Sequence, residues 1–141
     1  MTAKLTIADY PLAETRSADI RGQRGKSLDD ITLDAVIAGD ITMEDLRITP
    51  KALADQAEIA RAAKRPTLAL NFERAAELVN VPQDFIMSAY ELLRPGRAKT
   101  KEQLLQVAST FRQTYGAGQM ASFIEEAADV YERRGLFTYR F

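Results

Sequence analysis

The sequence predicts a mainly α-helical fold, made of short helices with an antiparallel C-terminal helical hairpin and an extended N-terminal arm. Helix-start signals recur from residue 27 onward, and apolar residues repeat at helical spacing in the second half of the chain. Residues 16–27, in contrast, hold one large apolar side chain, Ile20. We therefore expect an extended arm over residues 1–26 and one helical domain over residues 27–141.

The expected arm has too little apolar surface to bury itself. Residues 16–27 include two glycines and five charged side chains. A segment of that composition does not offset the entropy lost on ordering, so its order has to come from another surface. The arm is the first indication of a partner.

Six helix starts are marked in the domain. Three are capping boxes, in which a hydroxyl residue precedes an acid or amide by three positions and satisfies the free amides of the first turn. They are Ser27 with Asp30, Thr42 with Asp45, and Thr100 with Gln103. The other three are prolines, which the first helical position accepts: Pro50 with Thr49 as its cap, Pro66, and Pro82.

Glycine and proline mark the helix ends. Gly39 ends a short helix from about Leu33, and Pro66 stops the helix that begins at Pro50. Residues 94–96 stop the helix from Pro82. A weak strand pattern occurs over residues 136–141.

Two helices with equal apolar spacing predict the C-terminal hairpin. In each, five apolar residues make a single stripe at 3.6 residues per turn. The stripes are Leu104, Val107, Ala108, Phe111 and Tyr115, and then Met120, Phe123, Ile124, Ala127 and Tyr131. Gly116 and Gly118 separate the two helices, so we expect the stripes to face each other.

The helix from Pro66 has a core stripe and one apolar residue outside it. The stripe is Leu68, Phe72, Ala75, Ala76 and Val79. Leu70 lies about 200° from Leu68 around the helix, at about 100° per residue. Leu70 is therefore expected to face something other than the core of this chain.

Composition excludes most catalytic chemistry. The sequence has no histidine and no cysteine, which removes the commonest general base, the Ser/His/Asp and Cys/His arrangements, and thiolate metal sites. The acids between residues 29 and 40 lack the order of a calcium loop, and the adjacent Glu125 and Glu126 point about 100° apart on a helix. The sequence predicts no autonomous catalysis, and no metal or cofactor bound by this chain.

Three segments together carry a family resemblance: residues 9–13 (DYPLA), 45–49 (DLRIT) and 71–78 (NFERAAEL). They resemble the small, or gamma, subunit of adenosylcobalamin-dependent diol and glycerol dehydratases. The resemblance continues in order through residues 33–39, 56–60, 81–82, 89–90, 93–95, 101–105 and 121–131. The ordered co-occurrence over nearly the whole chain is specific, although no single segment is.

The resemblance implies a heterohexameric lyase with two large, two medium and two small subunits. Such an enzyme turns 1,2-propanediol or glycerol into an aldehyde and water by a radical mechanism. In that family the large subunit holds the substrate, a cation and the catalytic residues, and the cobalamin lies between the large and medium subunits. The small subunit has no activity alone and stabilises the large subunit.

A subunit interface is expected on two parts of the chain. The N-terminal part comprises Asp9, Tyr10, Pro11 and Leu12, and the second part comprises Leu70, Asn71 and Arg74 on the helix from Pro66. Both parts are expected to dock on the large subunit. Tyr10 and Arg74 are the expected anchors, because aromatic and arginine side chains supply much of the affinity of protein interfaces.

The resemblance also implies a bacterial, cytoplasmic enzyme. Family members associated with bacterial microcompartments carry a longer N-terminal extension, whereas Asp9 arrives here almost at once. We therefore expect a freely cytosolic enzyme and not an encapsulated one.

Two other functions compete with the dehydratase subunit. The chain could be a free-standing helical interaction adaptor, or a small nucleic-acid binder that uses the basic residues between Arg94 and Lys101. The net charge of −1 argues against the second, because nucleic-acid surfaces carry many more basic residues.

Overall fold

The computed structural model describes residues 4–138 and is helical throughout. No strand occurs within these residues, and an isolated bridge joins Arg21 and Ser27. The chain forms two compact units, Met1–Val79 and Asn80–Phe141. The mainly α fold is thus confirmed. Of the stretch with a weak strand pattern, residues 136–138 form a turn and a bend, and residues 139–141 lie outside the described part.

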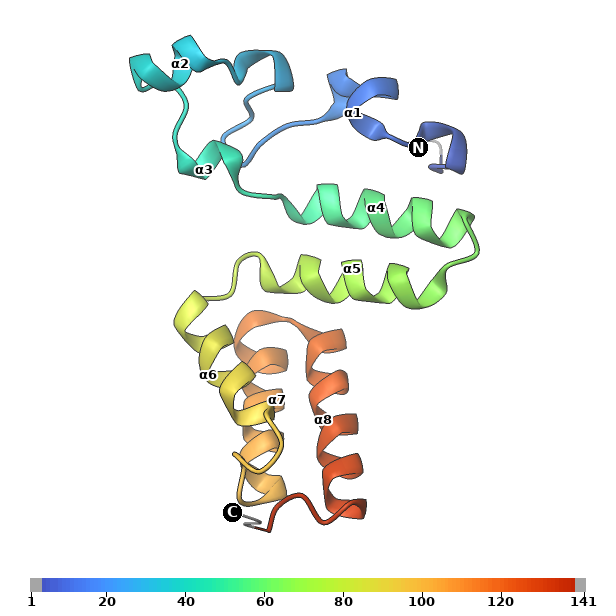
Figure 1. Cartoon of the computed structure of the whole chain (residues 1–141), viewed down its shortest axis with the longest axis vertical. Coiled ribbons are helices and arrows are strands. Elements are labelled where there is room, and N and C mark those ends of the chain that lie inside the picture. The colour runs from blue at the N-terminus through green and yellow to red at the C-terminus, as the bar shows by residue number, and fades with distance from the viewer. Residues whose placement is uncertain (1–3, 139–141) are drawn as a thin grey trace. The chain divides into compact units, whose positions relative to one another are not determined.

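The first unit contains five α-helices and three short 3-10 turns, and the second contains three α-helices within the described residues (Figure 1). In the first unit they are η1 (Ile7–Asp9), α1 (Leu12–Thr15), η2 (Ser17–Asp19), η3 (Leu28–Asp30), α2 (Leu33–Ala38), α3 (Met43–Leu46), α4 (Pro50–Ala62) and α5 (Pro66–Leu78). In the second they are α6 (Gln83–Leu93), α7 (Lys101–Tyr115) and α8 (Gly118–Arg133).

The helix starts follow the sequence signals closely. All three capping boxes form, and the Thr49 hydroxyl accepts a hydrogen bond from the Ala52 amide at the start of α4. Pro50 and Pro66 occupy the first helical turn as predicted, but Pro82 is the residue before α6. Gly39 and Gly116 end their helices in the left-handed conformation that glycine adopts without strain.

The core of the first unit lies between α4 and α5, which run side by side (Figure 1). Ala57 and Ala60 of α4 meet Ala69 of α5, which is fully buried. Leu68 and Phe72 pack against this cluster from α5. Small residues at the contact let the two backbones approach closely, and the larger side chains fill the edges.

The N-terminal segment has more local structure than an extended arm. It contains η1, α1 and η2, and its Leu5 and Leu12 pack with Ile59 of α4. Ile20 joins the same cluster. Three apolar side chains therefore fix the segment to α4, which is why it belongs to the same compact unit as α4 and α5.

The helical hairpin of α7 and α8 is confirmed, but α8 presents a different face to α7 than the sequence stripe predicted. Fully or almost fully buried residues on α7 are Leu104, Ala108 and Phe111. On α8 and just before it they are Ala117, Ala121, Ile124 and Ala128, whereas Phe123 is exposed. Because three of the four are alanine, the two helices pack closely, and only Ile124 of the predicted stripe is fully buried.

Ion pairs join α7 and α8 at both ends of the hairpin. Arg112 pairs with Glu125 near the turn, and its guanidinium also donates to the Ser122 hydroxyl at 3.2 Å. At the open end, the Lys101 ammonium lies 2.8 Å from an Asp129 oxygen and 2.7 Å from a Glu132 oxygen. Phe85 of α6 also packs in this unit. The centroid of its ring lies 4.8 Å from the centroid of the Phe111 ring.

Candidate subunit interface

The N-terminal part of the expected interface divides into inward and outward side chains. Leu12 is buried in the chain's own core, and Pro11 is half-buried and follows a cis peptide bond. Asp9 is half-buried and closes a capping box, accepting from the Thr6 amide at 2.7 Å and the Thr6 hydroxyl at 3.0 Å. Those hydrogen bonds hold the pKa of the Asp9 carboxyl below its usual value. Tyr10 projects outward and is 62% exposed.

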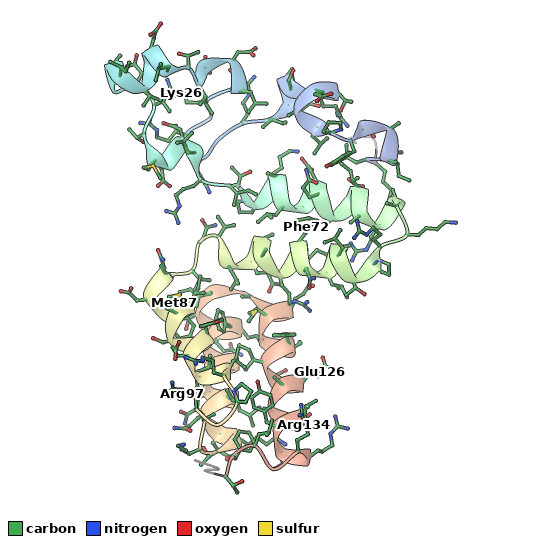
Figure 2. The ribbon with its side chains drawn as sticks, viewed as in Figure 1. Lys26, Phe72, Met87, Arg97, Glu126 and Arg134 are labelled. Carbon is green, nitrogen blue, oxygen red and sulfur yellow. The ribbon has the colours of Figure 1, made fainter. Side chains whose placement is uncertain are left out.

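Tyr10 stands at the edge of an open apolar pocket of about 290 Å³. The pocket is lined by Ile7 and Tyr10 from the N-terminal segment, Gln56, Ile59, Ala60, Ala63 and Arg65 from α4 and the turn after it, and Leu68 and Phe72 from α5. Phe72 lies between α4 and α5 (Figure 2). A pocket of this size and lining suits an apolar side chain of a partner protein.

The α5 part of the expected interface points away from that pocket. Leu70 is 42% exposed and does not line it, in agreement with its position off the core stripe. The exposed Asn71 accepts a short hydrogen bond from the half-buried Arg74, one turn along the same face. The structure therefore brings Asn71 and Arg74 together, but it does not bring Tyr10 and Leu70 together.

A larger apolar surface, which the sequence stripes did not indicate, lies on residues 28–48. We refer to these residues as segment 28–48. Seven large apolar side chains in it are exposed by 36% to 76%: Leu28, Leu33, Val36, Ile37, Met43, Leu46 and Ile48. α2 buries none of its residues, and α3 buries only Asp45. The signal in the sequence was the spacing of Leu33, Val36 and Ile37 on a six-residue helix with no matching helix beside it.

Polar contacts hold segment 28–48 to the loop that precedes it. The guanidinium of Arg24 makes a two-pronged ion pair with Asp45, with one nitrogen–oxygen distance of 2.8 Å, and donates to the Asp40 carbonyl at 3.0 Å. The side-chain amide of Gln23 donates to the Ile48 carbonyl at 3.1 Å. Gln23 and Arg24, which the sequence analysis assigned to an extended arm, thus contact α3 and the residues on either side of it.

Asp45 is the one charged residue that is buried within the described part of the chain. Its carboxylate accepts from Arg24 and from the Thr42 amide at 2.9 Å. The Arg24 hydrogen bonds, followed by the Thr42 amide, lower the pKa of Asp45 from 3.8 to about 2. The carboxylate is therefore charged at physiological pH.

Close backbone packing supports the same contact. A side chain at Gly22 would place its Cβ 2.8 Å from the Asp45 carbonyl oxygen, which is closer than real contacts allow. Only glycine therefore permits the loop at residue 22 to approach α3 this closely. The loop itself is closed by hydrogen bonds from the Gly22 amide to Lys26 and from the Gly25 amide to Gly22.

In the second unit, the basic residues between Arg94 and Lys101 are partly neutralised within the chain. Arg94 pairs with Glu91, and Lys101 pairs with Asp129 and Glu132. The Lys99 ammonium donates to the Gly96 carbonyl. This arrangement does not favour phosphate binding, because a nucleic-acid surface needs cations that face the solvent together.

The described residues present exposed apolar contact surface. Within residues 4–138, no three acidic side chains lie close enough to hold a metal ion. No helix in the described part of the chain has the length and apolarity that a bilayer crossing requires. What the described residues do present are exposed apolar side chains on segment 28–48 and the pocket beside Tyr10.

Comparison with known proteins identifies the family of the chain. Residues 5–138 match the family model described as dehydratase small subunit. The chain is 47% identical over 133 residues to the propanediol dehydratase small subunit of Citrobacter freundii, covering 94% of this chain and 76% of the relative. It is 46% identical over 128 residues to the propanediol dehydratase small subunit of Salmonella typhimurium, covering 91% and 73%. The chain therefore belongs to the dehydratase small subunit family.

Proposed function

We propose that this chain is the non-catalytic small subunit of an adenosylcobalamin-dependent propanediol dehydratase, a lyase that converts a 1,2-diol to an aldehyde and water. The observation that carries the proposal is the match over residues 5–138, together with 47% identity to a propanediol dehydratase small subunit. The chain works in the bacterial cytoplasm with large and medium subunits, two copies of each beside two of its own.

The sequence supports a non-catalytic role for this chain. It has neither an imidazole nor a thiolate, so this chain has no side chain of the usual kinds to ligate cobalt or to act as a nucleophile beside it. The titratable groups with shifted pKa values, such as Asp45, Lys101 and Glu125, are engaged in ion pairs within the chain. In our proposal the other subunits hold the cofactor, the cation and the substrate, and this chain supplies shape and contact surface.

The test is co-expression of the three subunits with and without this chain, followed by an assay for aldehyde formation from 1,2-propanediol. We expect activity only when all three chains are present, and none from this chain alone. Aldehyde formation by the isolated chain, or tight corrinoid binding by it, would contradict the proposal. A purified chain that recruits neither of the other subunits would favour a free-standing adaptor.

The two-part interface expected from the sequence is tested in the same system. Tyr10 is the exposed aromatic residue beside an apolar pocket, and Arg74 holds Asn71 on the α5 surface. In a Tyr10→Ala, Arg74→Ala double variant we expect weaker retention of the small subunit by the large and medium subunits. Retention at the wild-type stoichiometry and affinity would remove these two residues as anchors and leave the subunit role intact.

A further inference from the structure

Segment 28–48 exposes about as much apolar side chain as the largest apolar patch of a typical monomer. Its seven exposed large residues leave on the order of 500 Å² of apolar side chain in water, at about 120 Å² for one fully exposed side chain. That matches the largest apolar patch of a typical monomer, about 300–600 Å², and such patches are often functional. It is also more than half of the ~800 Å² that one partner contributes to an interface of standard size.

The same segment carries a strong negative charge. It contains six acidic residues and one basic residue, Arg47, so its net charge is −5, whereas that of the whole chain is −1. Glu44 pairs with Arg47 at 3.4 Å, and Asp45 is paired with Arg24. The other four acids, Asp29, Asp30, Asp34 and Asp40, are exposed residues that follow or flank the exposed apolar side chains.

The charge decides which occupant suits the surface. A second copy of this chain would bring two sets of four exposed carboxylates together, and like charges across an interface cost affinity. An anionic membrane or a nucleic acid is repelled in the same way. A protein face with an apolar centre and a rim of lysine and arginine side chains is complementary in both respects.

From these observations we infer that segment 28–48 is the main docking surface for the large dehydratase subunit, which meets it with an apolar face rimmed by basic side chains. This inference rests on the proposed function and extends it to a surface that neither part of the sequence-predicted interface includes. The Arg24–Asp45 contact and the Gln23 hydrogen bond keep the surface in its folded form before binding, which lowers the ordering cost of association.

A paired set of variants in the three-subunit complex tests the inference. Leu33 and Ile37 lie one turn apart on α2 and are the best-exposed aliphatic pair of the segment. In a Leu33→Gln, Ile37→Gln variant we expect the dissociation constant of the small subunit to rise on the order of 100-fold, because each residue is an apolar anchor. Glutamine keeps the helix propensity of α2, so the fold is expected to survive.

The matched control uses α6 of the second unit. Met87 and Tyr90 are also exposed apolar neighbours on one helix face. A Met87→Gln, Tyr90→Gln variant removes a comparable amount of apolar surface and is expected to change the dissociation constant by less than about 3-fold. Circular dichroism and thermal unfolding of each isolated variant check that both chains stay folded. Equal losses of affinity in the two variants, or no loss in the α2 variant, would overturn the inference.

A second measurement does not depend on loss of binding. A photo-crosslinking phenylalanine analogue in place of Ile37, in the otherwise unchanged complex, is expected to label the large subunit. Labelling of the medium subunit, of a second small subunit, or of nothing would overturn the inference. Failure of the wild-type chain to join the complex would instead refute the proposed function, so the two failures are distinguishable.

Discussion

One ion pair at the residue scale decides the shape of segment 28–48. Asp45 is buried on α3, and its partner Arg24 reaches it from the loop twenty-one residues earlier. Without the guanidinium, little would offset the hydration free energy that the buried carboxylate loses. The segment has almost no apolar core of its own, so this pair has more influence here than a comparable pair would have inside α4 or α7.

The pH dependence of this contact follows from the pKa of Asp45. Because the folded pKa is lowered from 3.8 to about 2, the pair stabilises the fold fully above pH 4 and loses that contribution as the pH falls through 2. We expect the carboxyl carbon of Asp45 to titrate near pH 2 by NMR. In Asp45→Asn, the protection factors of the amides of residues 42–46, which are corrected for the intrinsic pH dependence of exchange, should be lower at pH 7 and change little further on acidification.

Asp34→Asn is the matched control for that variant. It removes the same charge from an exposed position of α2 and is expected to leave exchange at residues 42–46 unchanged. An Asp45 carboxyl that titrates at an ordinary value near 4 would show that the Arg24 contact does not form in solution.

The glycine at position 22 makes a second prediction at this scale. Gly22→Ala would push a Cβ against the Asp45 carbonyl oxygen, so we expect destabilisation of about 1–3 kcal/mol. Thermal unfolding of the variant measures it. Gly118→Ala is the control, because a Cβ there meets nothing within 4 Å and the change occurs at the start of a helix. An unchanged melting temperature for Gly22→Ala would mean that the loop is free to move away from α3.

Local residue patterns could be predicted from the sequence, and the distant contact could not. The capping boxes at Ser27, Thr42 and Thr100 each depend on a residue three positions away, so the sequence alone predicts them. The capping role of Asp45 was predicted in this way. Its ion pair with Arg24 was not predicted. The loop contains two arginines, Arg21 and Arg24, and nothing in its sequence indicates which of them contacts Asp45.

At the element scale, α8 shows why apolar spacing is an incomplete guide. On α7 the spacing selected Leu104, Ala108 and Phe111 correctly. On α8 it selected Ile124, but the other fully buried residues are Ala121 and Ala128, which the predicted stripe did not include. The existence of the hairpin was predictable, whereas the rotation of α8 depends on how closely two particular helices approach.

Two phenylalanines of this hairpin provide a direct measurement. Phe111 is 1% exposed and touches the Phe85 ring, whereas Phe123 is 41% exposed. We expect Phe111→Ala to destabilise the fold by about 3–5 kcal/mol and Phe123→Ala by less than about 1.5 kcal/mol. Denaturant unfolding of the two variants tests this ordering. Equal losses would support the stripe predicted from the sequence over the face seen in the structure.

At the scale of the whole molecule, the sequence predicted the family and the helical class but not the largest exposed surface. The resemblance rested on ordered short segments, and the family match over residues 5–138 confirms it. The interface expected from it, at residues 9–12 and on α5, stays a prediction. Segment 28–48 was missed because exposure depends on which neighbour a helix lacks, and a sequence does not show missing neighbours.

Hydrogen exchange over the whole chain follows from this contrast. The α7–α8 hairpin has a buried seam, and α2 buries nothing, so amides of residues 33–46 should exchange many-fold faster than those of α7 and α8 in the isolated chain. In the complete enzyme we expect residues 33–46 to become at least about tenfold slower, and the α7–α8 amides to change little. Slow exchange of residues 33–46 in the isolated chain would contradict this picture.

The Lys101 ammonium at the open end of the hairpin has a chemical consequence. Its contacts with Asp129 and then Glu132 raise its pKa, so the neutral amine, the only form that condenses with a carbonyl group, is scarce at cellular pH. In the proposed enzyme, the small subunit would be continuously exposed to the aldehyde product. Lys101 should therefore form imines more slowly than Lys64, which is exposed in the turn before α5, and mass spectrometry after borohydride trapping would rank the two sites.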